Sequence, residues 1–381
     1  MDPKPMNLFI TLILFFFSIF SITSAQFYGD PPDETHPWAV HDNNRPQPMK
    51  VKPSALPGDP PSDAIILFDG TKNSFFKNWE HENPRRKKNW IVRNQRLISV
   101  KGAGSLISKA KFADCQLHIE WSAPMKIVGS GQGRGNSGVF LMGETEVQIL
   151  DNYNNPTYPD GFAGSVYGVM PPMVNALKPP GEWQIYDIIF RRPVLKDGKI
   201  LDEGSLTVFL NGVVVQDNTP LEGGGLHKKR SKSRAFPIVG PLKLQDHGNP
   251  VQFRNIWYRE LRKRPIEGGT DGALSSTASN EKRMEIAETI LNKTQNEDGI
   301  KKLLLLMEAL CYKNDDEVRL TVHRLSEKII MDIKKYPEGN ENDAKQIYQA
   351  LKYLERHKIV DTEHPNTVLL EKIIKKEGWA K

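Results

Sequence analysis

Three short segments of this chain carry more polar side chains than strand packing requires. They are Gly133–Gly138, Glu146–Asp151 and Leu244–Gly248, and each adjoins an apolar run typical of a β-strand. Together they supply carboxylate, amide and imidazole groups, which proteins use to move protons and to bind hydroxyl groups. The pattern indicates a candidate site for proton transfer or for contacts with a ligand.

The second segment places two polar side chains on one strand face. Residues two apart on a strand share a face, so Glu146 and Gln148 are expected to lie together. Asp151 joins them only if a bulge shifts the register. A carboxylate pair on such a face could do acid–base chemistry. A solvated strand face is the alternative.

The third segment adds a group that exchanges protons near neutral pH. His247 is flanked by Gln245 and Asp246, and Arg254 follows about one strand length later. The arginine could bind an oxyanion or pair with Asp246 or Glu146. A loop histidine without a role is the alternative for His247.

Two further side chains are candidates for contacts with the ligand. Asn136 lies just before a predicted strand and could bind a hydroxyl group. Trp183 offers an aromatic face that suits the apolar side of a sugar ring, although a core position explains it equally well.

The elements that must position these residues read as short strands separated by turns. Strand patterns occur at 64–68, 90–92, 116–121, 137–142, 145–150, 183–190, 206–210, 213–216 and 251–258. The pair Asn211-Gly212 is a strong hairpin signal. Repeated strands and turns predict a mainly β fold, a sandwich or jelly roll.

The composition changes on both sides of this region. Residues 26–62 form a proline-rich linker, 63–263 the sandwich, and 264–280 a second linker. From residue 281 to 381 apolar residues recur at helical spacing, which predicts a small helical domain. Asn314, followed by three acidic residues, is expected to cap one of its helices.

The first 25 residues resemble a signal peptide. An uncharged run from Leu8 to Ile22 follows Lys4 and ends at small residues before Gln26. An uncleaved anchor is the alternative. No second apolar run has membrane length, so we expect a secreted or periplasmic protein that is not an integral membrane protein after cleavage.

Cysteine content and charge exclude other classes. Cys115 and Cys311 each lie in an apolar pattern of a different predicted domain, so core thiols are favoured over a disulfide. The net charge is +6, and part of the excess lies in the loop His227–Arg234. No aromatic residues interleave with that loop, so a solvated loop is favoured and no nucleic-acid partner is expected.

Several of these segments in combination resemble the 3-keto-disaccharide hydrolase family, a concanavalin A-like sandwich. The resemblance covers about 200 residues and excludes the helical region. It rests on Leu67–Gly70, Trp79 and Trp90, Gly135–Gly138, Glu146–Asp151, Gly181–Gln184, Asn211-Gly212, Leu244–Gly248 and Phe253–Trp257. Arg93–Arg96, where the family usually turns on glycine, and the basic insertion near Lys228 depart from the pattern.

The resemblance implies cleavage of a glycoside already oxidised to a ketone at carbon three, by elimination and hydration or by net hydrolysis. Its implied catalytic residues are Glu146, Asp151, His247 and Arg254. Glu146 or His247 would be the base, and Arg254 would stabilise the enolate. The substrate-binding residues would be Asn136, Gln148, Trp183, Gln245 and Asp246.

Other interpretations stay open at this point. A divalent metal could stabilise the enolate, although no firm ligand set is present and no cofactor is firmly implied. The sandwich could bind carbohydrate without turnover. The whole chain could instead be a cell-surface interaction protein whose helical domain recruits a protein partner.

Overall fold

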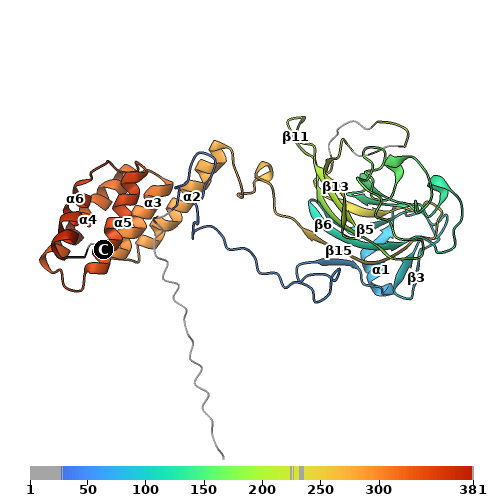
Figure 1. The fold of residues 1–381 in the computed structure, drawn as a ribbon, viewed down its shortest axis with the longest axis horizontal. Helices are drawn as coiled ribbons and strands as arrows, with labels where there is room; N and C mark the ends of the chain where they lie inside the picture. The colour runs from blue at the N-terminus through green and yellow to red at the C-terminus, as the bar shows by residue number, and fades with distance from the viewer. Residues whose placement is uncertain (1–26, 28, 224, 226, 231–235, 380–381) are drawn as a thin grey trace, which may run out of the picture. The chain divides into compact units, whose positions relative to one another are not determined.

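The computed structural model describes residues 27–379 except residues 28, 224, 226 and 231–235. It contains two compact units (Figure 1), one formed by Pro48–Asp271 and the other by the chain up to Gln47 together with Gly272–Lys381. The predicted signal peptide, residues 1–25, lies outside the described residues. No helix within the described ranges is long and apolar enough to cross a membrane.

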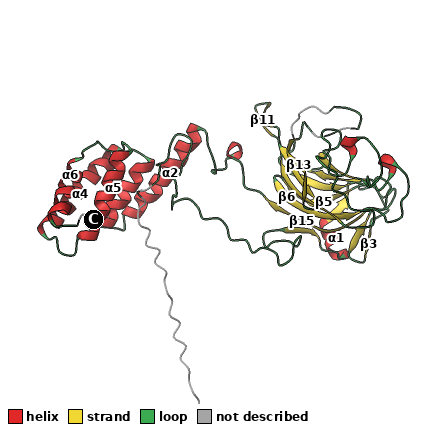
Figure 2. Cartoon of the chain, in the orientation of Figure 1, coloured by secondary structure: helices red, strands yellow, loops and turns green. Residues whose placement is uncertain are grey.

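The first unit is built from two antiparallel sheets, drawn yellow in Figure 2. Sheet A has the strand order β13-β12-β9-β6-β15-β4-β3, with β1 also paired to β15, and sheet B has the order β2-β5-β14-β7-β8. The pair β10-β11 forms a separate ribbon. This confirms the predicted mainly β jelly-roll sandwich.

The strands have the following bounds: β1 Ile65–Phe68, β2 Trp79–His81, β3 Ile91–Arg93, β4 Arg96–Ile98, β5 Leu106–Phe112, β6 Cys115–Ser122, β7 Ser137–Leu141, β8 Thr145–Ile149, β9 Gln184–Arg191, β10 Val194–Lys196, β11 Lys199–Asp202, β12 Ser205–Leu210, β13 Val213–Pro220, β14 Gly240–Leu244 and β15 Gln252–Glu260. One short helix, α1 (Lys72–Asn78), interrupts them and was not predicted.

Alternation along β6 shows why these residues form a sandwich. Leu117, Ile119 and Trp121 are fully buried and face sheet B through the core. The opposite face of sheet A is also covered at β15, next to β6, because the Gly58 carbonyl accepts hydrogen bonds from Asn255 Nδ2 at 2.8 Å and from the Trp257 indole at 2.9 Å. Part of the predicted linker 26–62 therefore lies across the outer face of sheet A.

Both predicted hairpins form. β7 pairs with β8, and β12 pairs with β13. Asn211 and Gly212 between the latter strands have φ of 55° and 80°, the left-handed values that a two-residue hairpin turn needs.

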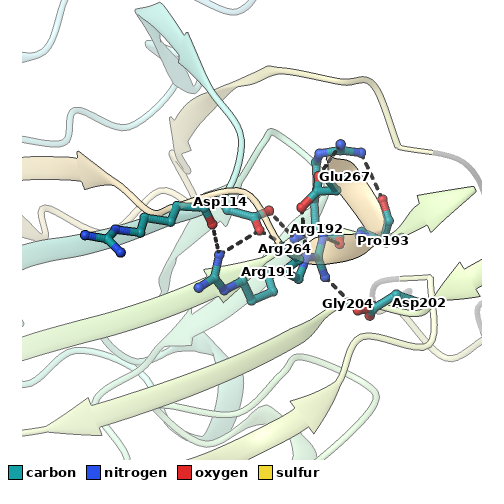
Figure 3. A network of polar contacts seen from close by, with 9 residues as sticks. Asp114, Arg191, Arg192, Pro193, Asp202, Gly204, Arg264 and Glu267 are labelled. Atoms are coloured by element: carbon teal, nitrogen blue, oxygen red, sulfur yellow. Dashed lines mark hydrogen bonds and ion pairs between the residues drawn. The ribbon is translucent and has the colours of Figure 1, made fainter. Parts of the chain in front are cut away.

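A network of charged side chains around the buried Asp114 closes the end of the sandwich after β15 (Figure 3). Asp114 accepts from Arg191 Nη1 at 3.1 Å and from the Arg192 backbone N–H at 2.9 Å, and lies 3.4 Å from Arg264 Nε. Arg264 and Arg192 also pair with Glu267. The neighbouring acids hold the pKa of Arg264 above its ordinary value. The predicted linker from residue 264 therefore begins as part of the sandwich.

The described part of the second unit contains five helices, and the helical spacing predicted the last four of them. They are α2 Ser276–Thr294, α3 Gly299–Tyr312, α4 Asp316–Lys335, α5 Glu341–Arg356 and α6 Pro365–Lys376. α2 begins five residues before the predicted domain start. The cap of α4 is Asp315 rather than Asn314, because the Asp315 carboxylate accepts from the backbone N–H groups of Glu317 and Val318.

The first part of the predicted proline-rich linker belongs to this helical unit. Asn44 Nδ2 donates to Glu308 Oε1 at 2.7 Å, and the Tyr312 hydroxyl donates to Asp42. Trp38 packs against the apolar cluster between α2 and α3. The described part of the predicted linker is thus divided between the two units, with the boundary after Gln47, rather than forming one free tether.

Candidate active site

The outer face of sheet B carries the polar side chains of the candidate site. On β8, Val147 is part of the core, so its neighbours Glu146 and Gln148 point to the opposite face. Antiparallel pairing sets Phe140 of β7 opposite Glu146, and Gly138 opposite Gln148. The predicted partnership of Glu146 and Gln148 on one face is therefore present.

The two cross-strand pairs, Glu146–Phe140 and Gln148–Gly138, each begin a row of side chains across the sheet, and strand β14 continues both rows. Lys243 is opposite Phe140, and its ammonium lies 4.2 Å from the centre of that ring. The Gln245 backbone N–H donates to the Gly138 carbonyl at 3.0 Å. Glu146 thus has a lysine in its own row and two glutamines, Gln148 and Gln245, in the next.

Glu146 is the buried carboxyl group of this face. The residue is 8% exposed, and no other described residue forms a hydrogen bond or ion pair with its side chain. Loss of water raises the pKa of Glu146 to about 8, against the opposing charge of Lys243. A carboxyl group with this pKa exchanges a proton readily near neutral pH.

Gly138 makes room for the Glu146 carboxylate. A Cβ atom on Gly138 would lie 2.1 Å from Glu146 Oε1 and 2.9 Å from Phe140 Cε2. The carboxylate therefore lies directly over the backbone of β7, at the centre of the two rows.

The substitution Gly138→Ala is expected to displace this carboxylate and to lower activity by about 10²-fold, as a shift near 1 Å in a catalytic group does. Turnover and thermal unfolding should be measured together. Gly133→Ala is the matched control, because a Cβ there meets nothing within 4 Å. Full activity of Gly138→Ala would contradict the assigned position of Glu146.

Amide and hydroxyl groups around Glu146 present polar atoms without partners. Gln148 Nε2 donates to Gln132 Oε1 at 3.0 Å, but Gln148 Oε1 is buried and unpaired within the described chain. The same is true of Gln245 Oε1 and Ser165 Oγ. Buried polar atoms are normally paired, so these atoms are suited to bind the hydroxyl groups of a ligand.

Asn136 supports this face indirectly. Its Nδ2 donates to the Gln132 carbonyl at 2.8 Å and lies 3.4 Å from Gln132 Oε1. Asn136 therefore holds the loop that orients Gln148, and its predicted contact with a sugar stays a prediction.

Arg254 and Trp183 lie on the other side of the sandwich. Arg254 Nε donates to Glu120 Oε2 at 2.6 Å, and its guanidinium lies 4.1 Å from the Trp183 ring. Both belong to the outer face of sheet A, so the core separates them from Glu146. The predicted pairing of Arg254 with Glu146 or Asp246 is wrong, and so is its place beside the base.

Asp151 and Asp246 have structural partners. Arg134 forms a bidentate pair with Asp151, at 2.6 and 3.1 Å. Asp246 accepts from the backbone N–H groups of Gly104 and Gly248, both at 2.9 Å. His247 is exposed, and no contact of its ring is seen within the described ranges. None of these three side chains forms a hydrogen bond or ion pair with Glu146 in the described chain, and their predicted roles in catalysis and binding stay predictions.

The structure adds a tyrosine to the site that sequence reasoning missed. The segment Gly164–Tyr167 runs antiparallel to β8, with Val166 bridged to Val147. The Tyr167 N–H donates to the Glu146 carbonyl at 3.1 Å, so the two residues are direct cross-strand neighbours. No strand-like alternation marks this segment in the sequence.

A cavity of about 440 Å³ lies beside Lys243, lined by residues of β2 and β5. Ile107 in its wall pairs with Lys243 across the sheet, and Glu82 forms an ion pair with it at 3.2 Å. The described residues include no group of three or more His, Cys, Asp or Glu able to hold a metal ion. The site therefore offers one carboxyl group, one lysine and several amides.

These features define a jelly-roll sandwich with a proton-exchanging carboxyl group on a face of unpaired amide oxygens. The 3-keto-alpha-glucoside-1,2-lyase-like domain family matches residues 63–259, about half of the chain. The chain belongs to this family, as its motifs predicted. A comparison with curated proteins gave no match.

A solved structure supports the same assignment. It comes from Parabacteroides distasonis, is named provisionally as a glycosyl hydrolase, and is 42% identical in sequence. The match covers 57% of this chain and 93% of that structure's chain, with a TM-score of 0.53. A second structure with the same provisional name and organism is 24% identical. The match covers 52% of this chain and 99% of that structure's chain, with a TM-score of 0.39. Porphyranase B from Zobellia galactanivorans is 12% identical over 55% and 97%, with a TM-score of 0.26.

Proposed function

We propose that the protein is an exported enzyme that cleaves 3-keto-glycosides by β-elimination, with Glu146 as the base. The observation that carries the proposal is the buried Glu146 carboxyl group, whose pKa is about 8. Family membership supports the substrate class. Export rests on the N-terminal sequence pattern alone.

The chemistry follows from the ketone at carbon three. The ketone acidifies the C2 proton, and Glu146 removes it to give an enolate. The enolate electrons then form the C1–C2 double bond and expel the aglycone oxygen. A base whose pKa lies near the working pH is suited to this step.

Lys243 takes the role that the sequence assigned to Arg254. Its charge acts on Glu146, and it lies in the same row of the face. We assign it to stabilise the negative charge of the enolate. Gln148 and Gln245 would bind sugar hydroxyls through their unpaired oxygens, and the adjoining cavity would receive the second sugar or aglycone.

The test is turnover of 3-keto-trehalose, 3-keto-sucrose and a 3-keto-β-glucoside in deuterated water. We expect cleavage of at least one substrate and deuterium at C2 of the hydrated product, or a 2-hydroxy-glucal intermediate. Both NMR signatures follow from breaking the C2–H bond. Cleavage without either signature would favour direct hydrolysis.

Binding without turnover is the competing outcome. If no keto-sugar is cleaved while unoxidised glycans bind to the same face, the sandwich is a carbohydrate-binding module. Binding should then be lost in Gln148→Ala and kept in the control Gly133→Ala.

A further inference from the structure

A chain of hydrogen bonds reaches the neighbour of Glu146. The Tyr167 hydroxyl is 2.9 Å from the Tyr158 hydroxyl and 2.8 Å from His227 Nδ1. The rings of Tyr167 and His227 are nearly parallel, with centroids 6.5 Å apart. Tyr167 thus connects the site with a second phenol and with an imidazole.

The position of Tyr167 follows from backbone pairing. Residues directly opposite in an antiparallel pair share a face, with Cβ atoms roughly 5 Å apart. The bridge between Val147 and Val166 makes Tyr167 the residue opposite Glu146. Both side chains therefore project from the outer face of sheet B.

The elimination proposed above needs a second proton transfer. When the C1–O bond breaks, an alkoxide leaves unless its oxygen is protonated in the same step. General acids supply this proton in enzymes and matter most for poor leaving groups. No role assigned so far provides that proton.

We propose that Tyr167 is the general acid that protonates the departing aglycone oxygen, with Tyr158 and His227 restoring its proton. This inference rests on the proposed function. The electrons of the C2–H bond become the second bond of the C1–C2 double bond, the C1–O electrons leave with oxygen, and that oxygen takes the Tyr167 proton. Glu146 holds the C2 proton, and the products are a 2-hydroxy-3-keto-glucal and an alcohol.

Other groups of the face are less suited to this role. Lys243 is held by Glu82 and lies over Phe140. His247 lies in an exposed loop. Burial and the nearby Tyr158 and Glu146 hold the pKa of Tyr167 well above its ordinary value, so the phenol carries its proton at neutral pH.

The basic loop that begins at His227 lies beside Tyr167 and so has a role in this proposal. His227 is its first residue, and Gly225 lies against the Tyr167 carbonyl, where a Cβ would come within 1.4 Å. The start of this loop therefore borders the site instead of being only a solvated insertion.

The test compares leaving groups in Tyr167→Phe. We expect a loss of about 10³-fold with methyl 3-keto-β-glucoside and less than about tenfold with the 4-nitrophenyl compound, since nitrophenolate leaves without a proton. Tyr158→Phe should also lose more activity with the methyl than with the 4-nitrophenyl compound, but both losses should be smaller than in Tyr167→Phe. Tyr153→Phe, from a nearby loop, is the matched control. Thermal unfolding shows that each variant is folded.

Equal losses with both leaving groups, or no loss, would overturn the role of Tyr167 while keeping the proposed function. If Tyr167→Phe fails to fold, Tyr158→Phe and His227→Gln decide the matter by the same comparison. No cleavage of any 3-keto-glycoside by the unchanged protein would overturn both proposals.

Discussion

Replacing Glu146 by glutamine is expected to lower kcat/KM for 3-keto-glycosides by about 10³-fold while the sandwich stays folded. Glutamine keeps the shape of the side chain over Gly138 but cannot accept the C2 proton. Steady-state kinetics with the substrate cleaved fastest would measure the loss. Glu144→Gln, in the turn of the same hairpin, is the matched control. Unchanged kcat/KM in Glu146→Gln would remove Glu146 as the base.

The pH dependence of activity follows from the same carboxyl group. The base must be ionised, and the pKa of Glu146 is about 8. kcat/KM should therefore rise about tenfold per pH unit below 8 and level off above it. A general acid at this position would give the opposite slope, so the profile separates the two roles.

Stability should change with pH in the opposite direction. The folded pKa of about 8 is above the ordinary value of 4.5, so the folded protein binds more protons between these values. The free energy of unfolding should fall as pH rises through this window. Glu146→Gln should lack this contribution, which urea unfolding at several pH values would show.

Removal of Asp114 is expected to give the largest loss of stability. Asp114→Ala leaves Arg191 Nη1 and the Arg192 backbone N–H without their acceptor and removes the carboxylate beside Arg264, and Asp114 is 6% exposed. Breaking a buried charge network in this way costs about 3–5 kcal/mol of unfolding free energy. Urea unfolding measures this change.

An exposed aspartate of the same unit provides the control. Asp217→Ala should change the free energy of unfolding by less than about 0.5 kcal/mol. A similarly small effect for Asp114→Ala would mean that water replaces its contacts, and that the network does not close the sandwich.

Local patterns predicted the parts of the fold that depend on local geometry. Alternation identified strands such as Gln116–Trp121, and Asn211-Gly212 identified a hairpin, because both signals lie within a few residues. Helical spacing likewise identified the second unit. The division of residues 26–62 was not predictable in this way, since Asn44 meets a glutamate 264 positions later.

The candidate site was predicted in part for the same reason. The period of two placed Glu146 and Gln148 on one face. It does not say which sheet a strand joins, so Arg254 was wrongly assigned to the site. Tyr167 was missed because its segment pairs with β8 without alternation of its own.

The chain is synthesised from its N-terminus, so the division of the linker between two units sets the order in which these units can fold. Asp42 and Asn44 leave the ribosome long before their partners Glu308 and Tyr312 are made. The sandwich, residues 48–271, is complete in between and can fold first, since domains generally fold as units during synthesis. The helical unit closes last, so a chain that stops early leaves Trp38 without its cover and open to chaperones and proteases.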